Sequence, residues 1–148
     1  MGKTTGKVRP EKEAAVALLR ASDPIRSRIE MVLKPLGLSP EQANVLAILR
    51  AAPDRTLPTL EIAARMVARA PNITRLIDKL IGKGLVTRCP LEEDRRVVQV
   101  RLTGKGAETV EEISPAADRA GVDALSCLSP KELKLMIRGL DRIRSAGP

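Results

Sequence analysis

The alternation of apolar and polar positions is most regular between residues 57 and 102, where it predicts two helices followed by two strands. Segment 70–81 carries an apolar stripe at helical spacing, with polar and basic side chains off that stripe. A shorter helical pattern, 60–67, precedes it. The runs 85–88 and 97–102 have strand character and flank a charged turn. The pattern therefore predicts helix, turn, helix and a two-stranded ribbon, in that order.

This order is typical of a winged helix-turn-helix. The second helix suits the major groove of DNA, and the basic tip of the ribbon suits the neighbouring minor groove. Gly82-Lys83-Gly84 ends the second helix, because glycine tolerates the left-handed conformation found at helix C-termini. The predicted fold class is mainly α with a small β-wing.

Helical patterns flank this segment on both sides. The predicted organisation is a flexible basic N-terminus (1–9), an N-terminal helix region (10–36), a winged lobe (38–102) and C-terminal helices (103–148). Pro24 either begins a new helix or kinks a long one, and Pro115 either kinks or divides the C-terminal pattern. Leu57-Pro58 is expected to be a short extended piece.

Polar residues in front of the helical patterns predict their N-termini. Ser39 and Ser129 are each followed three residues later by Gln or Glu, which predicts two capping boxes. Thr59 is expected to cap the helix that continues through residue 67. The last helix, after Ser129, is apolar over a broad face.

The broad apolar face of the outer helices needs a cover. A single lobe of this size is too small to cover the apolar positions of both the first and the last helix. We expect these helices to pair with those of a second copy in a homodimer. The alternative is that they pack back on their own domain.

Positive charge is concentrated in the winged segment. The 148-residue chain has a formal net charge of +8. Ten Lys and Arg against four Asp and Glu between Arg65 and Lys105 place a net +6 there. Such a concentration is the footprint of a protein that binds a polyanion. The alternative is a basic surface that serves solubility.

Several residue types are absent, and their absence excludes classes of function. The chain has no His, Phe, Tyr or Trp. It therefore has no rings on which single-stranded nucleic acid could stack, no histidine triad and no histidine metal site. Two cysteines cannot form a four-thiolate zinc site. We expect no cofactor, no metal and no catalytic residues.

The sequence also indicates a location. No apolar run reaches transmembrane length, and the basic N-terminus is not followed by the apolar segment of a signal peptide. The two cysteines, Cys89 and Cys127, make no disulfide framework and suit a reducing compartment. We therefore expect a cytoplasmic protein that does not bind membranes.

An ordered set of motifs resembles the MarR family of bacterial transcriptional regulators, over about residues 18 to 144. The most specific parts are Asn72-Ile-Thr-Arg-Leu-Ile-Asp-Lys-Leu, Lys83-Gly-Leu-Val, Asp94-Arg-Arg and Val100-Arg-Leu-Thr-x-x-Gly106. The resemblance implies a helical dimer whose two winged lobes straddle a pseudo-palindromic operator. It also implies a repressor, less often an activator, that a small phenolic or other lipophilic molecule, or cysteine oxidation, releases from DNA.

The resemblance assigns candidate DNA contacts in two places. The recognition helix corresponds to residues 70–83, and the contacts that it and the residue before it offer are Arg69, Pro71, Asn72, Thr74, Arg75 and Lys79. Arg69, Ala70 and Pro71 stand where family members often have Ser or Thr, and Pro71 suits a helix start. The wing corresponds to Asp94, Arg95 and Arg96. The aspartate is expected to orient the wing and Arg96, or secondly Arg95, to enter the minor groove.

Two further sites are weaker candidates. The family's effector pocket lies between the dimer helices and the lobe, and here it could be lined by Ile29, Leu33, Val45, Met66 and Leu85. The alternative is that these residues are plain core. Cys89, close to basic wing residues, is a candidate redox sensor, and the alternative is a strand-end residue without a role.

Other functional classes stay open beside a sequence-specific regulator. A low-specificity architectural protein could use the same basic face, and salt dependence and specificity ratio distinguish the two. An enzyme would have to work with Asp, Glu or Lys alone, and no paired set stands out. A protein-interaction module with a vestigial wing would not bind duplex DNA even at low salt.

Overall fold

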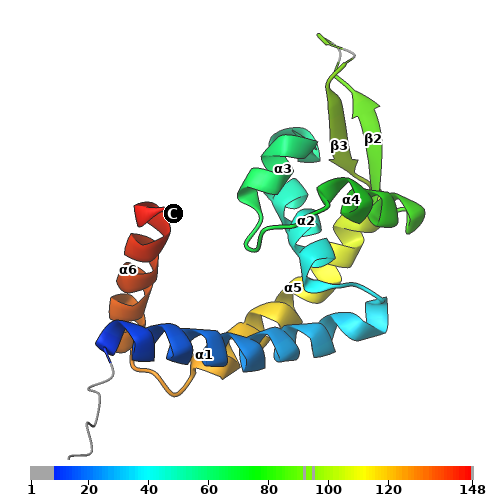
Figure 1. Ribbon diagram of the computed structural model, residues 1–148. Helices are drawn as coiled ribbons and strands as arrows, with labels where there is room; N and C mark the ends of the chain where they lie inside the picture. The colour runs from blue at the N-terminus through cyan, green and yellow to red at the C-terminus, as the bar shows by residue number, and fades with distance from the viewer. Residues whose placement is uncertain (1–8, 92, 95, 148) are drawn as a thin grey trace, which may run out of the picture.

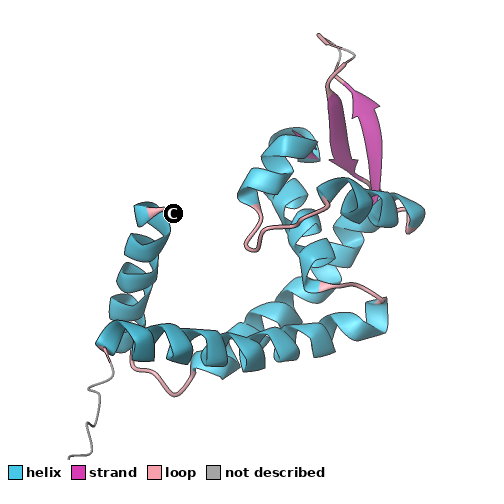
Figure 2. Ribbon diagram, viewed as in Figure 1, coloured by secondary structure: helices cyan, strands magenta, loops and turns pink. Residues whose placement is uncertain are grey.

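A computed structural model describes residues 9–91, 93–94 and 96–147, and it has a winged lobe carried on long helices (Figures 1 and 2). The predicted flexible N-terminus falls outside these residues except for Arg9. The elements are α1 (Pro10–Leu33), η1 (Lys34–Leu36), α2 (Pro40–Ala51), η2 (Pro53–Arg55), β1 (Thr56–Pro58), α3 (Thr59–Arg65), α4 (Ile73–Gly82), β2 (Val86–Pro90), β3 (Val98–Leu102), α5 (Gly104–Leu125) and α6 (Pro130–Ala146). The predicted fold class, mainly α with a small β-wing, is confirmed.

The hydrophobic core lies inside the winged lobe, where α2, α3 and α4 meet the base of the sheet. The first part of α5 closes the core from the other side. The fully buried side chains of the core come from seven elements, α1, α2, α3, α4, β2, β3 and α5: Leu33, Val45, Leu46, Leu49, Ile62, Ile77, Leu80, Val86, Val100 and Val110. Burial at about 25 cal/mol per Å² of apolar surface makes this cluster the main source of the lobe's stability.

The wing is part of a three-stranded antiparallel sheet with strand order β1-β3-β2, where the sequence predicted a two-stranded ribbon. The extended piece at Leu57 pairs with Val100 of β3, so it becomes a third strand. Both side chains are buried, and this burial joins two segments more than forty residues apart. The pattern around Leu57 predicted an extended backbone but not its partner, because pairing depends on the tertiary fold.

The two long helices are continuous through their prolines. Pro24 lies inside α1 and Pro115 lies inside α5, so neither residue divides its helix. The second half of α1 packs against α5 (Figure 1). An interior proline removes one backbone hydrogen bond, yet the helical backbone continues past each of these exposed residues.

Three N-termini were predicted, and two of them are confirmed. Ser39 and Ser129 each form a complete capping box, with Gln42 and Glu132 as the respective partners. The prediction for Thr59 was wrong. Thr59 is itself the first residue of α3, Pro58 is the N-cap, and no side chain caps this helix. Helix α3 also ends at Arg65 rather than continuing through residue 67.

The start of α5 is fastened to the end of α4 and the start of β2. The Thr103 hydroxyl donates a hydrogen bond to the Gly84 carbonyl at 2.7 Å, and it accepts one from the Gly106 amide at 3.0 Å. A Cβ atom at Gly106 would lie 2.1 Å from the Leu85 carbonyl oxygen. Only glycine allows this close approach of helix and strand.

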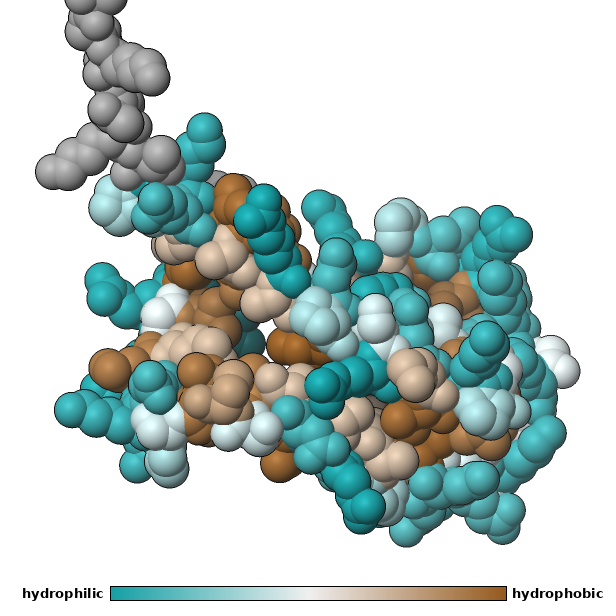
Figure 3. Space-filling view, turned by 90° about the horizontal axis from the view of Figure 1, so that it is seen from below, coloured by the Kyte–Doolittle hydropathy of each residue, from teal (hydrophilic) through white to brown (hydrophobic). Residues whose placement is uncertain are grey.

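Helix α6 extends away from the lobe. It contains no buried residue, and within the described chain it packs extensively on no other element. Its exposed apolar side chains are Leu135, Ile137, Leu140 and Ile143. Leu18 and Leu19 of α1 and Val122 of α5 are exposed as well. Figure 3 shows hydrophobic residues among polar ones at the left of the view, where these terminal helices lie.

Within the described part of the chain, no helix combines the length and the apolar character that crossing a bilayer requires.

Candidate nucleic-acid interface

Helix α4 presents one apolar and one polar face. Ile77 and Leu80 are fully buried in the lobe, and Ile73 and Leu76 pack against the same core. The opposite face exposes Thr74, Arg75, Asp78 and Lys79 to solvent. The residues predicted to face a groove are therefore on the outside, and the apolar stripe fixes the orientation of the helix.

The N-terminus of α4 lies later in the chain than predicted. The helix begins at Ile73, whereas the pattern predicted it from residue 70. Asn72 is the N-cap, and its side-chain oxygen accepts a hydrogen bond from the Arg75 amide at 3.0 Å. Pro71 and Ala70 therefore belong to the loop before the helix. The cap engages the oxygen of Asn72 and leaves its NH₂ group as the donor for a DNA contact.

The structure divides the basic residues of the winged segment into two groups. In the first group each side chain already has a partner: Arg65 with Glu61, Lys83 with the Gly37 carbonyl, Arg88 with Asp78, Arg101 with the Thr56 hydroxyl and Lys105 with the Lys83 carbonyl. The second group comprises Arg69, Arg75, Lys79 and Arg96. These are exposed, and no carboxylate of the described chain lies within 4.0 Å of them.

The wing turn is organised by Asp94. Its carboxylate accepts a hydrogen bond from the Arg96 amide at 3.0 Å, and its carbonyl accepts one from the Val97 amide at 2.9 Å. Arg96 lies exposed at this turn. Arg95, the second candidate for the minor groove, lies outside the described residues, as does Glu92. Asp94 thus holds the backbone of the described part of the turn through two hydrogen bonds.

An ion pair between α4 and the wing was not predicted from the sequence. The Arg88 guanidinium of β2 and the Asp78 carboxylate of α4 are 2.7 Å apart. This ion pair joins the helix and the strand that a DNA duplex would contact together. Both residues stand in the family-like motifs, but their contact needs the tertiary approach of α4 and β2. The Arg88 guanidinium is therefore already paired with a carboxylate, unlike the four cations of the second group.

A hollow with a volume of about 550 Å³ lies between α1, α2, α5 and the loop after α3. Three of the five predicted pocket residues, Ile29, Leu33 and Met66, line it. Val45 and Leu85 do not line it, and both belong to the core of the lobe. For these two residues the plain-core alternative holds. Most other lining side chains are aliphatic, and the volume is in the range of small-molecule sites.

The cysteines do not add a metal or disulfide site. Cys89 is half-buried in β2, and Cys127 is exposed in the turn between α5 and α6. Across residues 9–91, 93–94 and 96–147, no three His, Cys, Asp or Glu side chains gather as metal ligands. The candidate DNA interface is therefore built from the exposed basic and polar side chains of α4 and the wing.

Comparison with known proteins agrees with this geometry. Residues 38–98, which include α2, the helix-turn-helix and the wing up to the start of β3, match the sequence model of the MarR family. The chain carries a MarR-family domain. Solved structures of MarR-family transcriptional regulators resemble it as well.

Likeness to these structures extends over the terminal helices as well. AbsC, a MarR-family transcriptional regulator from Streptomyces coelicolor, is 21% identical with a TM-score of 0.85, covering 96% of this chain and 97% of AbsC. Sco3205 from the same organism, solved in complex with DNA, is 19% identical with a TM-score of 0.85, over 99% of this chain and 94% of its own.

A third solved structure is similar over nearly the whole chain. Bordetella bronchiseptica BpsR, whose DNA binding is regulated by 6-hydroxynicotinic acid, is 21% identical with a TM-score of 0.82, over 97% of this chain and 98% of its own. At these identities the likeness establishes the MarR fold of the whole chain. It does not assign individual contacts.

Proposed function

We propose that this chain is a dimeric, sequence-specific transcriptional regulator of double-stranded DNA, acting as a repressor that a small lipophilic effector releases. The observation that carries the proposal is a group of four exposed cations in a MarR-family domain: Arg69 in the loop before α4, Arg75 and Lys79 on α4, and Arg96 in the wing. Cations without carboxylate neighbours are available to phosphates and base edges.

The geometry favours duplex DNA over other nucleic acids. Helix α4 offers Thr74 and Arg75 from one exposed face, and an arginine can bind guanine through two hydrogen bonds in the major groove. The cap leaves the Asn72 NH₂ group on the same end of the helix. The absence of aromatic side chains argues against single-strand binding by stacking. Sco3205, which has the same fold, was solved with DNA.

A homodimer is supported by the unburied apolar face of the terminal helices. Helix α6 has no buried residue, and its apolar side chains Leu135, Ile137 and Ile143 are each more than half exposed. Pairing with the same helices of a second copy removes this surface from water. A two-fold dimer also presents two α4 helices, which matches a pseudo-palindromic operator.

An effector site is supported by the hollow between the long helices and the lobe. It is lined by α1 and α5 on one side and by α2 and residues 66–68 on the other. A ligand seated there contacts both the dimerisation helices and the loop that leads into α4. Its binding free energy can therefore favour one arrangement of lobe and helices over another. BpsR, of the same fold, is regulated by a small molecule.

The first test is a footprint with competition on the DNA that flanks the protein's own coding region, at about 0.15 M salt. A specific dimeric regulator protects a two-fold-related site and resists excess random duplex. Weak uniform binding with a steep salt slope would instead identify the low-specificity architectural protein. Absence of duplex binding at low salt would identify an interaction module with a vestigial wing.

Substitution of the wing arginine tests the interface itself. Arg96→Ala is expected to lower operator affinity at least about tenfold, because an arginine in a narrow minor groove meets an enhanced negative potential. The control is Arg50→Ala, which removes the same charge from a residue paired with Glu111 of α5. Equal affinities for the two variants, with normal thermal stability, would contradict the proposed role of the wing.

A further inference from the structure

The hollow at the junction of the lobe and the long helices has an aliphatic interior. Its apolar lining comes from all the elements around it: Ile25, Ile29 and Leu33 of α1, Ala43 and Ala47 of α2, Met66 and Val67 of the following loop, and Val110, Ile113 and Ala117 of α5. None of these side chains offers a hydrogen bond. An occupant therefore has an apolar body, and its polar group lies at the rim.

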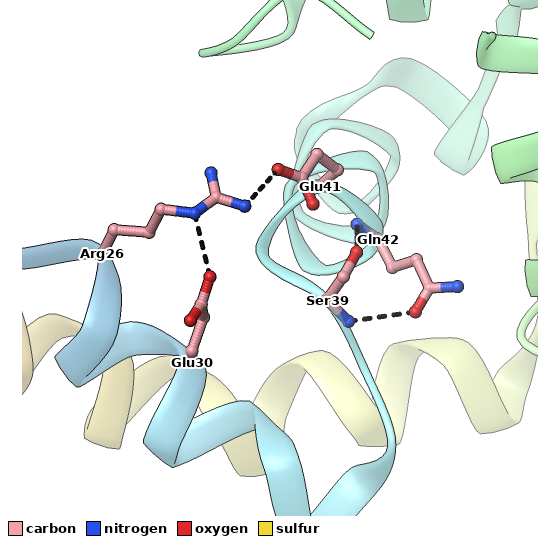
Figure 4. Close-up of polar contacts among 5 residues, drawn as sticks. All are labelled: Arg26, Glu30, Ser39, Glu41 and Gln42. Carbon is pink, nitrogen blue, oxygen red and sulfur yellow. Dashed lines mark hydrogen bonds and ion pairs between the residues drawn. The ribbon is translucent and has the colours of Figure 1, made fainter. Parts of the chain in front are cut away.

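Among the residues that the structure describes, Arg26 is the only cation that lines the hollow, and carboxylates already balance its charge. Its Nε lies 2.9 Å from Glu30 Oε1, and its Nη2 lies 2.8 Å from Glu41 Oε1 (Figure 4). The hydrogen bond from Arg26 holds the pKa of Glu41 below its usual value, so Glu41 is ionised at neutral pH. An anionic ligand would have to displace one of these carboxylates from the guanidinium.

Helix α5 contributes a carboxylate to the rim that has no ion-pair partner in the described chain. Asp118 lines the hollow, and no Lys or Arg nitrogen of the described chain lies within 4.0 Å of it. Among the lining residues Arg26 contributes one positive charge, and Glu41 and Asp118 contribute two negative charges. The local balance at the hollow is thus negative, although the whole chain has a net charge of +8.

Uncharged polar groups at the rim do not change this balance. The Asn44 side-chain oxygen already accepts a hydrogen bond from the Val67 amide at 2.8 Å. Ser22 donates its hydroxyl to the Leu19 carbonyl within α1. Ser114, one turn before Asp118 on α5, is the remaining hydroxyl at the rim. Beside Asp118 it can accept a hydrogen bond from an ammonium group.

We propose that the hollow takes a lipophilic cation, a small molecule with an apolar body and one ammonium group, which lies against Asp118. This proposal rests on the proposed effector site and names its ligand class. The aliphatic lining binds the body through apolar burial, and the ammonium forms an ion pair and keeps part of its hydration at the exposed rim. A neutral ligand lacks the ion pair, and an anion is repelled by Asp118.

The test compares three ligands with one body and different heads: 2-(1-naphthyl)ethylamine, 2-(1-naphthyl)ethanol and 1-naphthaleneacetate. Naphthalene emission reports binding directly to the full-length protein, because the chain has no Trp, Tyr or Phe to contribute background. The amine is expected to bind about fivefold more tightly than the alcohol, and the alcohol more tightly than the carboxylate. The difference is expected to narrow at about 1 M salt, where exposed charges are screened.

Variants locate the ion pair. Asp118→Asn is expected to reduce the amine's affinity to that of the alcohol and to leave the alcohol unchanged. The matched control is Glu108→Gln, which removes an exposed carboxylate of α5 that does not line the hollow. Ala117→Leu fills the apolar interior and is expected to weaken all three ligands, which places the body there.

The outcomes separate the ligand class from the effector site. Equal affinities for the three heads, or tightest binding of the carboxylate, would overturn the cation and keep the site. An amine preference that survives Asp118→Asn would also overturn it. Absence of binding by all three ligands, with the footprint on DNA intact, would overturn both the ligand class and the effector site while DNA binding stands.

Discussion

The winged lobe and the terminal helices begin their helices with the same local signals but differ in whether the apolar faces of those helices are buried. Both contain a helix that begins with a complete capping box, α2 at Ser39 and α6 at Ser129. Helix α2 then buries Val45, Leu46 and Leu49, whereas α6 buries nothing. Capping determines where a helix begins, but it does not supply a partner for the apolar face. The lobe buries its apolar faces within one chain, whereas the apolar face of α6 stays exposed to solvent.

The largest effect expected from a single substitution lies inside the lobe. Gly106→Ala places a Cβ atom 2.1 Å from the Leu85 carbonyl oxygen, so helix α5 must move away from the sheet. We expect the free energy of unfolding to fall by about 3 kcal/mol, measured by urea denaturation.

The control for this substitution is Gly82→Ala at the end of α4, where a Cβ atom would meet nothing within 4 Å. It is expected to change stability by no more than about 1 kcal/mol and in the stabilising direction. Similar losses from both variants would show that the close approach at Gly106 does not stabilise the lobe.

The second effect tests the terminal helices. Leu135→Asp combined with Ile143→Asp introduces charges on the exposed apolar face of α6. The dimer is expected to dissociate in sedimentation experiments while circular dichroism keeps its helical signal. Operator affinity is expected to fall by about a hundredfold, because one lobe then binds one half-site.

Leu60→Asp is the matched control, because Leu60 is 82% exposed on α3 and belongs to the lobe. This variant is expected to remain dimeric. A double α6 variant that stays dimeric at micromolar concentration would remove the contrast between the two regions.

The third effect is smaller and lies between α4 and the wing. The Arg88–Asp78 pair is 40% and 53% exposed, so solvent screens it. A double-mutant cycle with Arg88→Gln and Asp78→Asn is expected to give a coupling of about 0.5 kcal/mol in stability. The same cycle applied to operator affinity is expected to show a larger coupling, since the pair joins the two elements that we propose to contact DNA. Equal couplings would make the pair a surface contact only.

The smallest effect is a pH dependence that again separates the regions. Glu41 has a pKa below its ordinary value of 4.5 because of its hydrogen bond with Arg26. Its contribution to stability is therefore full above pH 4.5 and is lost as the pH falls through the lowered folded pKa. Glu41→Gln is expected to lower the urea midpoint slightly at pH 6 and not at pH 3.

Glu132 of α6 provides the comparison for this pH dependence. The Ser129 hydroxyl and then the Ser129 amide lower its pKa in the same direction. Because α6 does not pack on the lobe, Glu132→Gln is expected to leave the unfolding midpoint of the lobe unchanged at both pH values. A shift equal to that of Glu41→Gln would couple α6 to the lobe within one chain.

Much of the fold and part of the candidate interface follow from the sequence, because their causes act over a few residues. The serine three residues before Gln42 or Glu132 defines a helix start, and the apolar stripe of Ile73, Ile77 and Leu80 defines which face of α4 is buried. The exposed positions of Thr74, Arg75 and Lys79 follow from that stripe. The order of helix, turn, helix and strands needs only these local signals.

Tertiary structure decided the features that depend on partners distant in sequence. Pairing with Val100 makes Leu57 part of a third strand, and α1 and α5 each continue through a proline where the sequence left a break open. It also decided which cations stay free, because Arg88 meets Asp78 only when α4 and β2 approach each other. Apolar residues such as Val45 and Ile29 look alike in the sequence. One is core and the other lines the hollow, because burial depends on how all the elements pack.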